Sequence, residues 1–269
     1  MSKIDEFLEE RKYLKAVTPR TLEWHQSMLN LLPNDEPTEN QLKRLVVDLR
    51  SRGWKPITVN GAIRSWNAYL KWSGSSVKMS KLKEEQKALP TFSLDDIRKF
   101  QLWKPKKWVD KRLQVLVLLL CDSAARITEV LQLKWAEVNL DDCLIVIHGK
   151  GQKDRTLPIS LELRKALFKW GHENKHEFVL STQHHNGMLN RFNSLRDVRV
   201  LCLKLGIKPP ARLLHSFRHT WALNAIRRGA SAFHVQKQLG HTDLEMTRRY
   251  CNLSTADLSA VHQRLSLLA

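Results

Sequence analysis

Residues 126–250 of the chain include an ordered set of side chains that together could carry out chemistry on a phosphate group. The set combines basic side chains, proton donors and one nucleophile, in this order: Arg126, Lys150, His215, Arg218, His241 and Tyr250. Arginine, lysine and histidine side chains can gather positive charge and proton donors around one phosphate, and a tyrosine oxygen can then attack the phosphorus. These residue types predict cleavage of a phosphodiester through a covalent bond to tyrosine.

The two arginines are predicted to stabilise the negative charge that grows on the non-bridging oxygens during attack. A guanidinium group keeps its charge and donates two parallel hydrogen bonds, which suits a pair of phosphate oxygens. Arg126 and Arg218 are the candidates, and Glu129, one helical turn from Arg126, could orient it. Removal of one such donor typically costs roughly 3–4 kcal/mol of transition-state stabilisation.

The remaining members of the set are predicted to handle protons. The departing 5′-oxygen needs a proton, and Lys150, between two glycines at the tip of a predicted turn, is the candidate general acid. His215, three residues before Arg218 on one helical face, can take or relay the tyrosine proton. His241 follows Gly240 at a predicted helix N-terminus, where a phosphate oxygen is also favoured.

Each of these residues has a more ordinary interpretation when it is considered alone. An isolated arginine or lysine is usually a surface charge, an isolated histidine is usually a helix cap, and an isolated tyrosine is usually half buried by packing. The phosphate site is favoured because five separate segments occur in one order, with the spacing His-x-x-Arg and nine residues from His241 to Tyr250.

The charge of the chain favours a polyanionic partner. The formal net charge is +18, and residues 1–50 hold 8 basic against 9 acidic residues, so residues 51–269 carry a balance of +19. Surplus lysine is often only solvated surface, but a surplus of this size in one part of a chain is more typical of a nucleic-acid-binding face.

The sequence also predicts a cytoplasmic protein that uses no metal or other cofactor. The amino terminus has no apolar signal segment, and the longest apolar run, residues 115–121, is too short to cross a membrane. His172 and His176 are four residues apart, but they lie in a polar helix end, and no cluster has metal-ligand spacing. The cysteines form no Cys-x-x-Cys pair, as expected in a reducing compartment; they are Cys121, Cys143, Cys202 and Cys251.

The hydrophobic pattern predicts two domains joined by a linker. Residues 1–74 are predicted to be helical, with helix starts at Thr18-Pro19, at the capping box Thr38 to Gln41 and at Lys55-Pro56. Trp66 and Trp72 are predicted to be core residues, with base stacking as the minority interpretation. Residues 75–92 are predicted to be a lysine-rich polar linker.

Residues 93–269 are predicted to form a second, mixed domain, so the predicted fold class is mainly α with a small antiparallel sheet (α+β). Two strands are expected at residues 143–148 and 155–159, with Lys150 in the turn between them. A capping box from Thr242 to Glu245 predicts a short helix with Tyr250 near its far end. The expected helices lie at residues 161–170, 191–205, 216–228 and 232–239.

The segments that hold the candidate site resemble the tyrosine recombinase, or phage integrase, family, and the resemblance covers about residues 10–260. They are Ala125-Arg126-Ile127-Thr128-Glu129, Gly149-Lys150-Gly151, His215-Ser216-Phe217-Arg218-His219-Thr220, Leu239-Gly240-His241 and Tyr250. All six candidate positions match the family's catalytic set, with Tyr250 as the nucleophile. The chain departs from the usual Gly-Leu-Arg at Ala124-Ala125-Arg126, and Thr128 stands where serine is common; both changes are small.

The resemblance implies a two-domain clamp around double-stranded DNA, in which residues 1–74 are the core-binding domain and residues 93–269 are the catalytic domain. A homotetramer on two recombination sites exchanges strands through 3′-phosphotyrosyl bonds and a Holliday junction, without ATP or a required metal. Residues 254–269 resemble the family's tail, which packs on a neighbouring protomer. Accessory DNA-bending or directionality factors can join such complexes, and the enzyme is expected at the nucleoid.

Because the first helical domain begins within about 20 residues of Met1, no separate arm-binding domain is expected, and the layout resembles Xer proteins or the compact integrases of phages and mobile elements. Two alternatives to a site-specific recombinase remain open. One is a non-catalytic DNA-binding protein of the same fold, against which the six intact positions argue. The other is a relaxing enzyme of the type IB topoisomerase kind, which uses similar chemistry but acts as a monomer at many sites.

Overall fold

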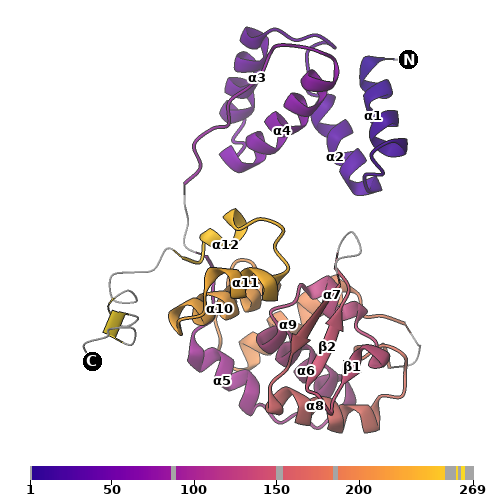
Figure 1. Cartoon of the computed structure of the whole chain (residues 1–269), viewed down its shortest axis with the longest axis vertical. Helices are drawn as coiled ribbons and strands as arrows, with labels where there is room; N and C mark the ends of the chain where they lie inside the picture. The colour runs from indigo at the N-terminus through magenta and orange to yellow at the C-terminus, as the bar shows by residue number, and fades with distance from the viewer. Residues whose placement is uncertain are drawn as a thin grey trace. The chain divides into compact units, whose positions relative to one another are not determined.

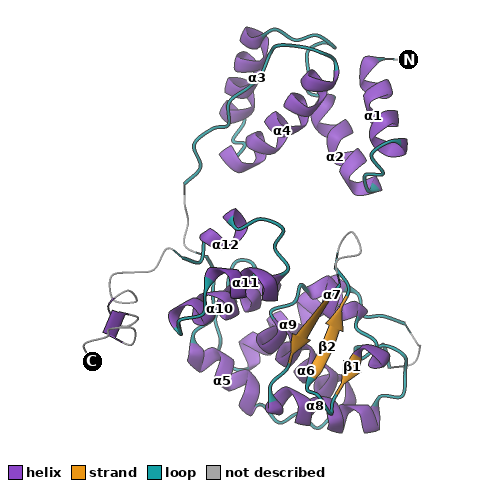
Figure 2. Cartoon of the chain, viewed as in Figure 1, coloured by secondary structure: helices purple, strands orange, loops and turns teal. Residues whose placement is uncertain are grey.

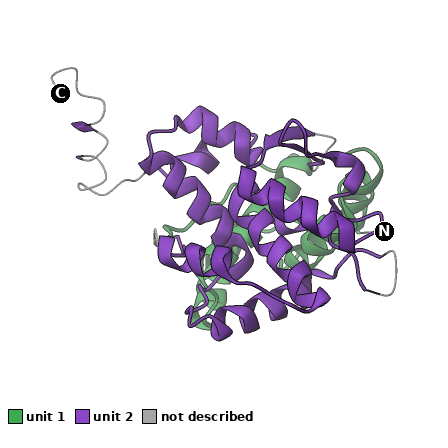
Figure 3. Ribbon diagram, turned by 90° about the horizontal axis from the view of Figure 1, so that it is seen from below, with its two compact units in different colours: residues 1–87 green, residues 88–269 purple. Residues whose placement is uncertain are grey.

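The computed structural model describes residues 2–85, 89–149, 154–183 and 187–251, together with Ser259, His262 and Gln263. The chain divides into two compact units, Met1–Lys87 and Ala88–Ala269 (Figure 3). The predicted fold class is confirmed, because helices dominate and one small antiparallel sheet is present (Figure 2). Within the described ranges, the structure contains no helix that is both long enough and apolar enough to span a bilayer.

In the described part of the first unit the chain forms four helices, and three of them begin at the signals that the sequence analysis named. The predicted capping box at Thr38 is confirmed, because its hydroxyl accepts from the Gln41 amide and the Gln41 side chain accepts from the Thr38 amide. Pro19 and Pro56 are the first helical residues of their helices, where a missing N–H costs nothing. The helices are α1 (Lys3–Tyr13), α2 (Pro19–Leu29), α3 (Glu39–Ser51) and α4 (Pro56–Trp72) (Figure 1).

Aromatic side chains fill the core of this unit. Trp66 is fully buried, and its Nε1 donates to the Met28 carbonyl at 2.8 Å, so its assignment to the core is confirmed and its ring face is not free for base stacking. Phe7 packs edge-on against Tyr69 and Trp72. This contact ties α1 to α4.

Part of the segment predicted as a linker is attached to the first unit. Asn67 exchanges two hydrogen bonds with the backbone of Met79, at 2.8 and 2.9 Å. Asn60 does the same with the backbone of Leu82, at 2.9 and 2.7 Å. Side-chain amides thus replace the missing backbone partners of an extended segment, and the division between the units lies further along, at residues 87–88.

The second unit is built around one apolar helix, α6 (Trp108–Ser123), which packs against α5, α8, α9 and α10. A three-stranded antiparallel sheet has the order β1-β2-β3, with Ile145 opposite Leu157 and both side chains buried. The two longer strands confirm the predicted hairpin. The other elements are α5 (Leu94–Leu102), α7 (Ile127–Gln132), η1 (Trp135–Glu137), β1 (Val138–Asn139), β2 (Leu144–Ile147), β3 (Arg155–Pro158), α8 (Leu161–Glu173), α9 (Arg191–Lys204), α10 (Leu213–Arg227), α11 (Ala232–Leu239) and α12 (Glu245–Arg248).

The last helices of the unit lie side by side and carry most of the candidate site. α10 packs on α6 and on α11, and α11 packs on α12 (Figure 1). The prediction of a helix start at Thr242 is wrong: α12 begins at Glu245, and the Asp243 carboxylate accepts from the Glu245 amide at 2.9 Å. Asp243 supplies the hydrogen bond that the predicted capping box assigned to threonine. Tyr250 follows α12 by two residues.

Candidate active site

Arg218 is anchored where the ends of two other helices meet. Its side chain extends from α10, its Nη1 donates to the Ala124 carbonyl at 2.9 Å, and its Nη2 donates to the Leu239 carbonyl at 2.7 Å. Ala124 caps the end of α6, and Leu239 is the last residue of α11. Carbonyls at helix ends lack helical partners and carry partial negative charge, so they hold this guanidinium in one orientation.

The backbone of Ala124, the C-cap residue of α6, has a conformation that residues other than glycine rarely adopt. Its φ is 55°, in the left-handed region that favours glycine. The sequence departure from Gly to Ala therefore falls at the residue whose carbonyl binds Arg218. The Ala124 methyl group is fully buried, in a cluster with Ala222, Leu239 and Tyr250.

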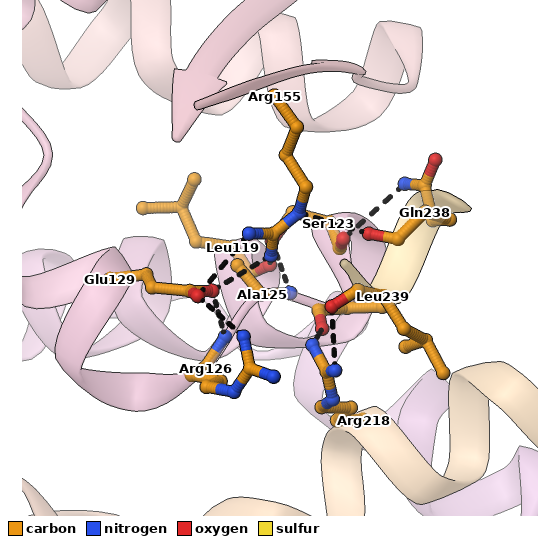
Figure 4. Close-up of polar contacts among 10 residues, drawn as sticks. Leu119, Ser123, Ala125, Arg126, Glu129, Arg155, Arg218, Gln238 and Leu239 are labelled. Atoms are coloured by element: carbon orange, nitrogen blue, oxygen red, sulfur yellow. Dashed lines mark hydrogen bonds and ion pairs between the residues drawn. The ribbon is translucent and has the colours of Figure 1, made fainter. Parts of the chain in front are cut away.

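A single buried glutamate holds two arginines beside Arg218. Glu129 Oε1 accepts from Arg126 Nη1 at 2.8 Å, and Glu129 Oε2 accepts from Arg155 Nη2 at 2.8 Å (Figure 4). Oε2 also accepts from the Arg126 amide at 2.7 Å. The predicted orientation of Arg126 by Glu129 is observed, and the geometry is that of a helix N-cap, because Arg126 immediately precedes α7.

Arg155 was not among the candidate residues, and it ties the sheet to the helical part of the site. It stands at the start of β3, and its Nε donates to the Gln238 carbonyl at 3.1 Å. Its side chain also lies close to Gly240, where an added Cβ would come within 3.2 Å of it. No short sequence motif singles out this arginine, because its partners come from α7 and α11.

The cluster carries more positive than negative charge. Three guanidinium groups, those of Arg126, Arg155 and Arg218, surround the one carboxylate of Glu129. Burial first, and then repulsion from Arg126, lowers the pKa of Arg218 to about 10, so it remains charged at neutral pH. An anion bound between the arginines would relieve this repulsion. The geometry therefore suits a phosphate.

Tyr250 lies beside this cluster with its hydroxyl hydrogen-bonded to a histidine. The distance from Tyr250 Oη to His219 Nδ1 is 2.9 Å, and both side chains are buried. Burial raises the pKa of Tyr250, while Arg218, Arg249 and Arg126 act in the opposite direction. The phenol is therefore protonated at neutral pH in the free protein.

The three tyrosines of the chain differ sharply in their surroundings. Tyr69 is fully buried in the first unit, its hydroxyl donates to the Asp35 carbonyl at 2.9 Å, and burial raises its pKa to about 12. Tyr13 is exposed on α1. Of the three, Tyr250 is the one that neighbours an arginine cluster.

Of the two predicted histidines, His241 contacts Tyr250, and His215 contacts the Tyr250 partner His219. The His241 ring stacks on Tyr250 with 6.4 Å between centroids, and its Nδ1 lies 2.9 Å from Thr247 Oγ1. Burial, followed by repulsion from Arg218, lowers the pKa of His241 to about 4. His215 is exposed on α10, and its ring centroid is 6.4 Å from that of His219. Desolvation and then Arg191 lower the pKa of His215.

Lys150 lies outside the described residues, so its predicted role stays a prediction. The described part of the hairpin ends at Gly149 and resumes at Asp154. At its base, His148 bridges two carboxylates, with Nε2 at 2.7 Å from Glu137 and Nδ1 at 2.9 Å from Asp154. In the described ranges, histidine, cysteine and acidic side chains do not gather in any group of three that could hold a metal.

A first prediction concerns Glu129, whose side chain is only 6% exposed. Burial alone would raise its pKa, but hydrogen bonds from Arg155 and Arg126 outweigh this and lower it. Glu129→Gln should reduce the free energy of unfolding at pH 7 by roughly 3–5 kcal/mol, because it removes the buried charge that pairs with the partly buried guanidinium groups of Arg155 and Arg126. Urea unfolding followed by circular dichroism measures this change.

The free energy of unfolding that Glu129→Gln loses should decrease as the pH falls. A carboxylate whose folded pKa is lowered stabilises the fold above its unfolded pKa, about 4.3, and loses that contribution as the pH falls through its folded pKa. The difference between wild type and Glu129→Gln should therefore shrink below about pH 4. Glu162→Gln, which removes an exposed pair with Lys165, is the matched control and should cost at most about 1 kcal/mol. Equal losses in the two variants would contradict the prediction.

Comparison with known proteins places this site in a family. The model of the family described as "Phage integrase family" matches residues 94–257, which include every candidate site residue. The chain is 28% identical over 240 residues to tyrosine recombinase XerA of Pyrococcus furiosus, covering 86% of this chain and 82% of that protein. It is 23% identical over 290 residues to tyrosine recombinase XerD of Listeria innocua, with 97% of each chain covered.

Solved structures share the fold across both units. The Tn1549 transposon integrase in complex with transposon right-end DNA aligns with a TM-score of 0.79 at 16% identity, with 100% of both chains covered. The XerA recombinase aligns with a TM-score of 0.57 at 21% identity, with 98% of this chain and 97% of that chain covered. The chain therefore belongs to the phage integrase family and is a tyrosine recombinase that resembles the Xer enzymes over most of its length.

Proposed function

We propose that this chain is a site-specific DNA recombinase that cuts and rejoins double-stranded DNA through a 3′-phosphotyrosyl bond to Tyr250. The observation that carries the proposal is the position of the Tyr250 hydroxyl beside a cluster of three arginines and one glutamate, in which Arg218 and Glu129 are buried. Such a cluster has an unbalanced positive charge, which the single negative charge of a phosphodiester would reduce. The family membership of the chain supports the same conclusion.

The proposed reaction begins when a phosphate of the DNA occupies the space beside Arg126 and Arg218. Their positive charges stabilise the additional negative charge on the non-bridging oxygens in the transition state. Because Arg218 is held by two carbonyls and Arg126 by Glu129, little reorganisation is needed when the substrate binds. His241 is proposed to bind the same phosphate, and His215 to take part in proton transfer near it.

Bond making and bond breaking then follow in one step. Tyr250 Oη forms a bond to phosphorus, the bond from phosphorus to the 5′-oxygen breaks, and Lys150 is proposed to give that oxygen its proton. A 5′-hydroxyl from a partner strand reverses the step and releases the tyrosine. In this proposal, residues 1–74 bind the DNA core site and residues 93–269 catalyse, with residues 75–92 between them.

We further propose that the active species is a homotetramer on two DNA sites. Tail residues 254–269 contact a neighbouring protomer in this proposal. Accessory DNA-bending or directionality factors join the complex where the system uses them. The enzyme then acts at the nucleoid, in the cytoplasm. A relaxing enzyme of the topoisomerase type would instead work as a monomer on DNA without paired sites. A non-catalytic DNA-binding protein would bind the site without cutting it.

One experiment separates these three functions. A binding sequence is first selected from a pool of random duplexes, and a nick is then placed beside the cleavage position so that the cut fragment diffuses away; we call this duplex the nicked selected site. The recombinase should give an SDS-resistant adduct with this duplex and exchange strands between two intact sites. Relaxation of plasmids that lack the site would favour the topoisomerase, and binding without any adduct would favour the non-catalytic protein.

The salt dependence of DNA binding provides a second prediction. Residues 51–269 carry a balance of +19, and each neutralised phosphate releases bound counterions. For about six neutralised phosphates, the logarithm of the association constant should fall with the logarithm of salt concentration with a slope of about −5 or steeper. Fluorescence anisotropy with the selected duplex measures the slope. A nearly flat dependence would contradict a clamp that contacts many phosphates.

A further inference from the structure

The hydrogen bond between Tyr250 and His219 joins the proposed nucleophile to a histidine outside the six family positions. Tyr250 Oη and His219 Nδ1 are 2.9 Å apart, with 5.8 Å between ring centroids and 45° between ring planes. The two side chains are 3% and 8% exposed. The tyrosine comes from the segment after α12 and the histidine from α10, so tertiary packing creates the contact.

The surroundings keep His219 neutral in the free protein. Burial first, and then the nearby charges and His215, lower its pKa to about 4. The groups that face the pair come from several elements: His215 and Arg218 on α10, Arg212 immediately before α10, Arg126 before α7, Arg249 after α12, and His241 after α11. A neutral imidazole has one nitrogen without a proton. When the ring proton is on Nε2, Nδ1 accepts the hydrogen of the Tyr250 hydroxyl.

We propose that His219 Nδ1 is the base that takes the Tyr250 proton during attack on DNA and returns it when the phosphotyrosyl bond is resealed. The sequence alone assigned this role to His215. In the structure, however, His219 contacts the hydroxyl. The His215 ring is exposed, stands one helical turn before His219 on α10, and has its centroid 6.4 Å from that of His219. This inference rests on the proposed function, because it needs Tyr250 to be the nucleophile.

The attack moves one proton to His219 and exchanges one bond from phosphorus to oxygen for another. The Tyr250 O–H bond breaks, its proton binds Nδ1, and the Oη–P bond forms. The P–O5′ bond breaks at the same time, and the 5′-oxygen takes a proton from the acid assigned to Lys150. In the free protein the phenol is a far weaker acid than the His219 imidazolium. Burial first, and then His215 and the nearby arginines, make His219 a weak base. The proton therefore moves only as the Oη–P bond forms, after the phosphate has offset the arginine charges.

Two substitutions of His219 separate proton transfer from positioning. His219→Asn can place Oδ1 near the position of Nδ1 and accept the same hydrogen bond, but an amide does not take up the proton. His219→Ala removes both properties. With the nicked selected site, the rate of covalent adduct formation should fall by roughly 10²–10⁴ in both variants at neutral pH, and it should rise with pH as the phenol ionises. Recovery of the wild-type rate by His219→Asn would overturn the proposal in favour of positioning alone.

A change of the nucleophile controls for misfolding of the variants. Replacing Tyr250 with a polyfluorinated tyrosine gives a phenol that is already ionised at slightly alkaline pH and needs no base. In that background, His219→Ala should form the adduct within a few-fold of the rate of unsubstituted His219. A deficit as large as with ordinary tyrosine would overturn the proposal and assign His219 a structural role. If the wild-type chain gives no adduct at all, the proposed function fails before His219 is tested.

Discussion

Tyr250→Phe is expected to abolish covalent attachment of the protein to DNA. The change removes one oxygen and keeps the ring in its buried cluster with Ala222 and Leu239. The lost hydrogen bond leaves the buried Nδ1 of His219 without this partner and should cost about 1–3 kcal/mol of stability, which is less than the roughly 5–15 kcal/mol that folded proteins typically have. The variant should therefore fold and bind the selected duplex with wild-type affinity, and denaturing gel electrophoresis should show no SDS-resistant adduct with the nicked selected site.

Tyr13→Phe is the matched control, because it makes the same chemical change at an exposed position of the first unit. It should leave the adduct yield unchanged. An adduct that persists in Tyr250→Phe would transfer the nucleophile to another residue. Loss of DNA binding in the same variant would mean that the phenol matters for binding and not only for chemistry.

Lys150→Ala is expected to slow cleavage of a normal phosphodiester by roughly 10²–10⁴, the contribution of one general acid. If Lys150 protonates the departing 5′-oxygen, its loss matters only while that oxygen is a poor leaving group. Replacing the bridging 5′-oxygen with sulfur gives a leaving group that needs no proton. Most of the lost rate should then return, measured as adduct formation under single-turnover conditions.

Arg126→Ala provides the contrast to Lys150→Ala. Its proposed task is to stabilise charge on the non-bridging oxygens, so sulfur at the bridging position should not restore its rate. If sulfur fails to rescue Lys150→Ala as well, the lysine is a phosphate or base contact, and Lys153 or His215 becomes the candidate acid. Rescue of both variants would show that the assay does not report the chemical step.

Local sequence signals predicted most of the elements that position the site. The capping box at Thr38 and the apolar, largely β-branched run at residues 144–147 depend on neighbouring residues alone, so they could be predicted without the fold. Helix α1 was not predicted, because it buries only Phe7 and has a weak apolar pattern. Strand β1 has two residues, too few for any periodicity.

The contacts within the site depended on packing and were only partly predictable. The link from Glu129 to Arg126 could be inferred, because the two residues are three positions apart. Arg155 and His219 were missed as members of the site, because their partners lie 26 and 31 residues away along the chain. The sequence signal for His219 was its position next to Arg218 and four residues after His215, which puts all three near the start of one helix.

The most direct test of the central claim is to locate the DNA on the protein. The adduct of the wild-type chain with the nicked selected site is digested with nuclease and trypsin, and the modified peptide is sequenced by mass spectrometry. The nucleotide should be found on Tyr250, the first residue of the tryptic peptide 250–264, linked through its 3′-phosphate, and the other DNA fragment should carry a free 5′-hydroxyl. A nucleotide on the peptide of Tyr13 or Tyr69, or a 5′-phosphate linkage, would contradict the account.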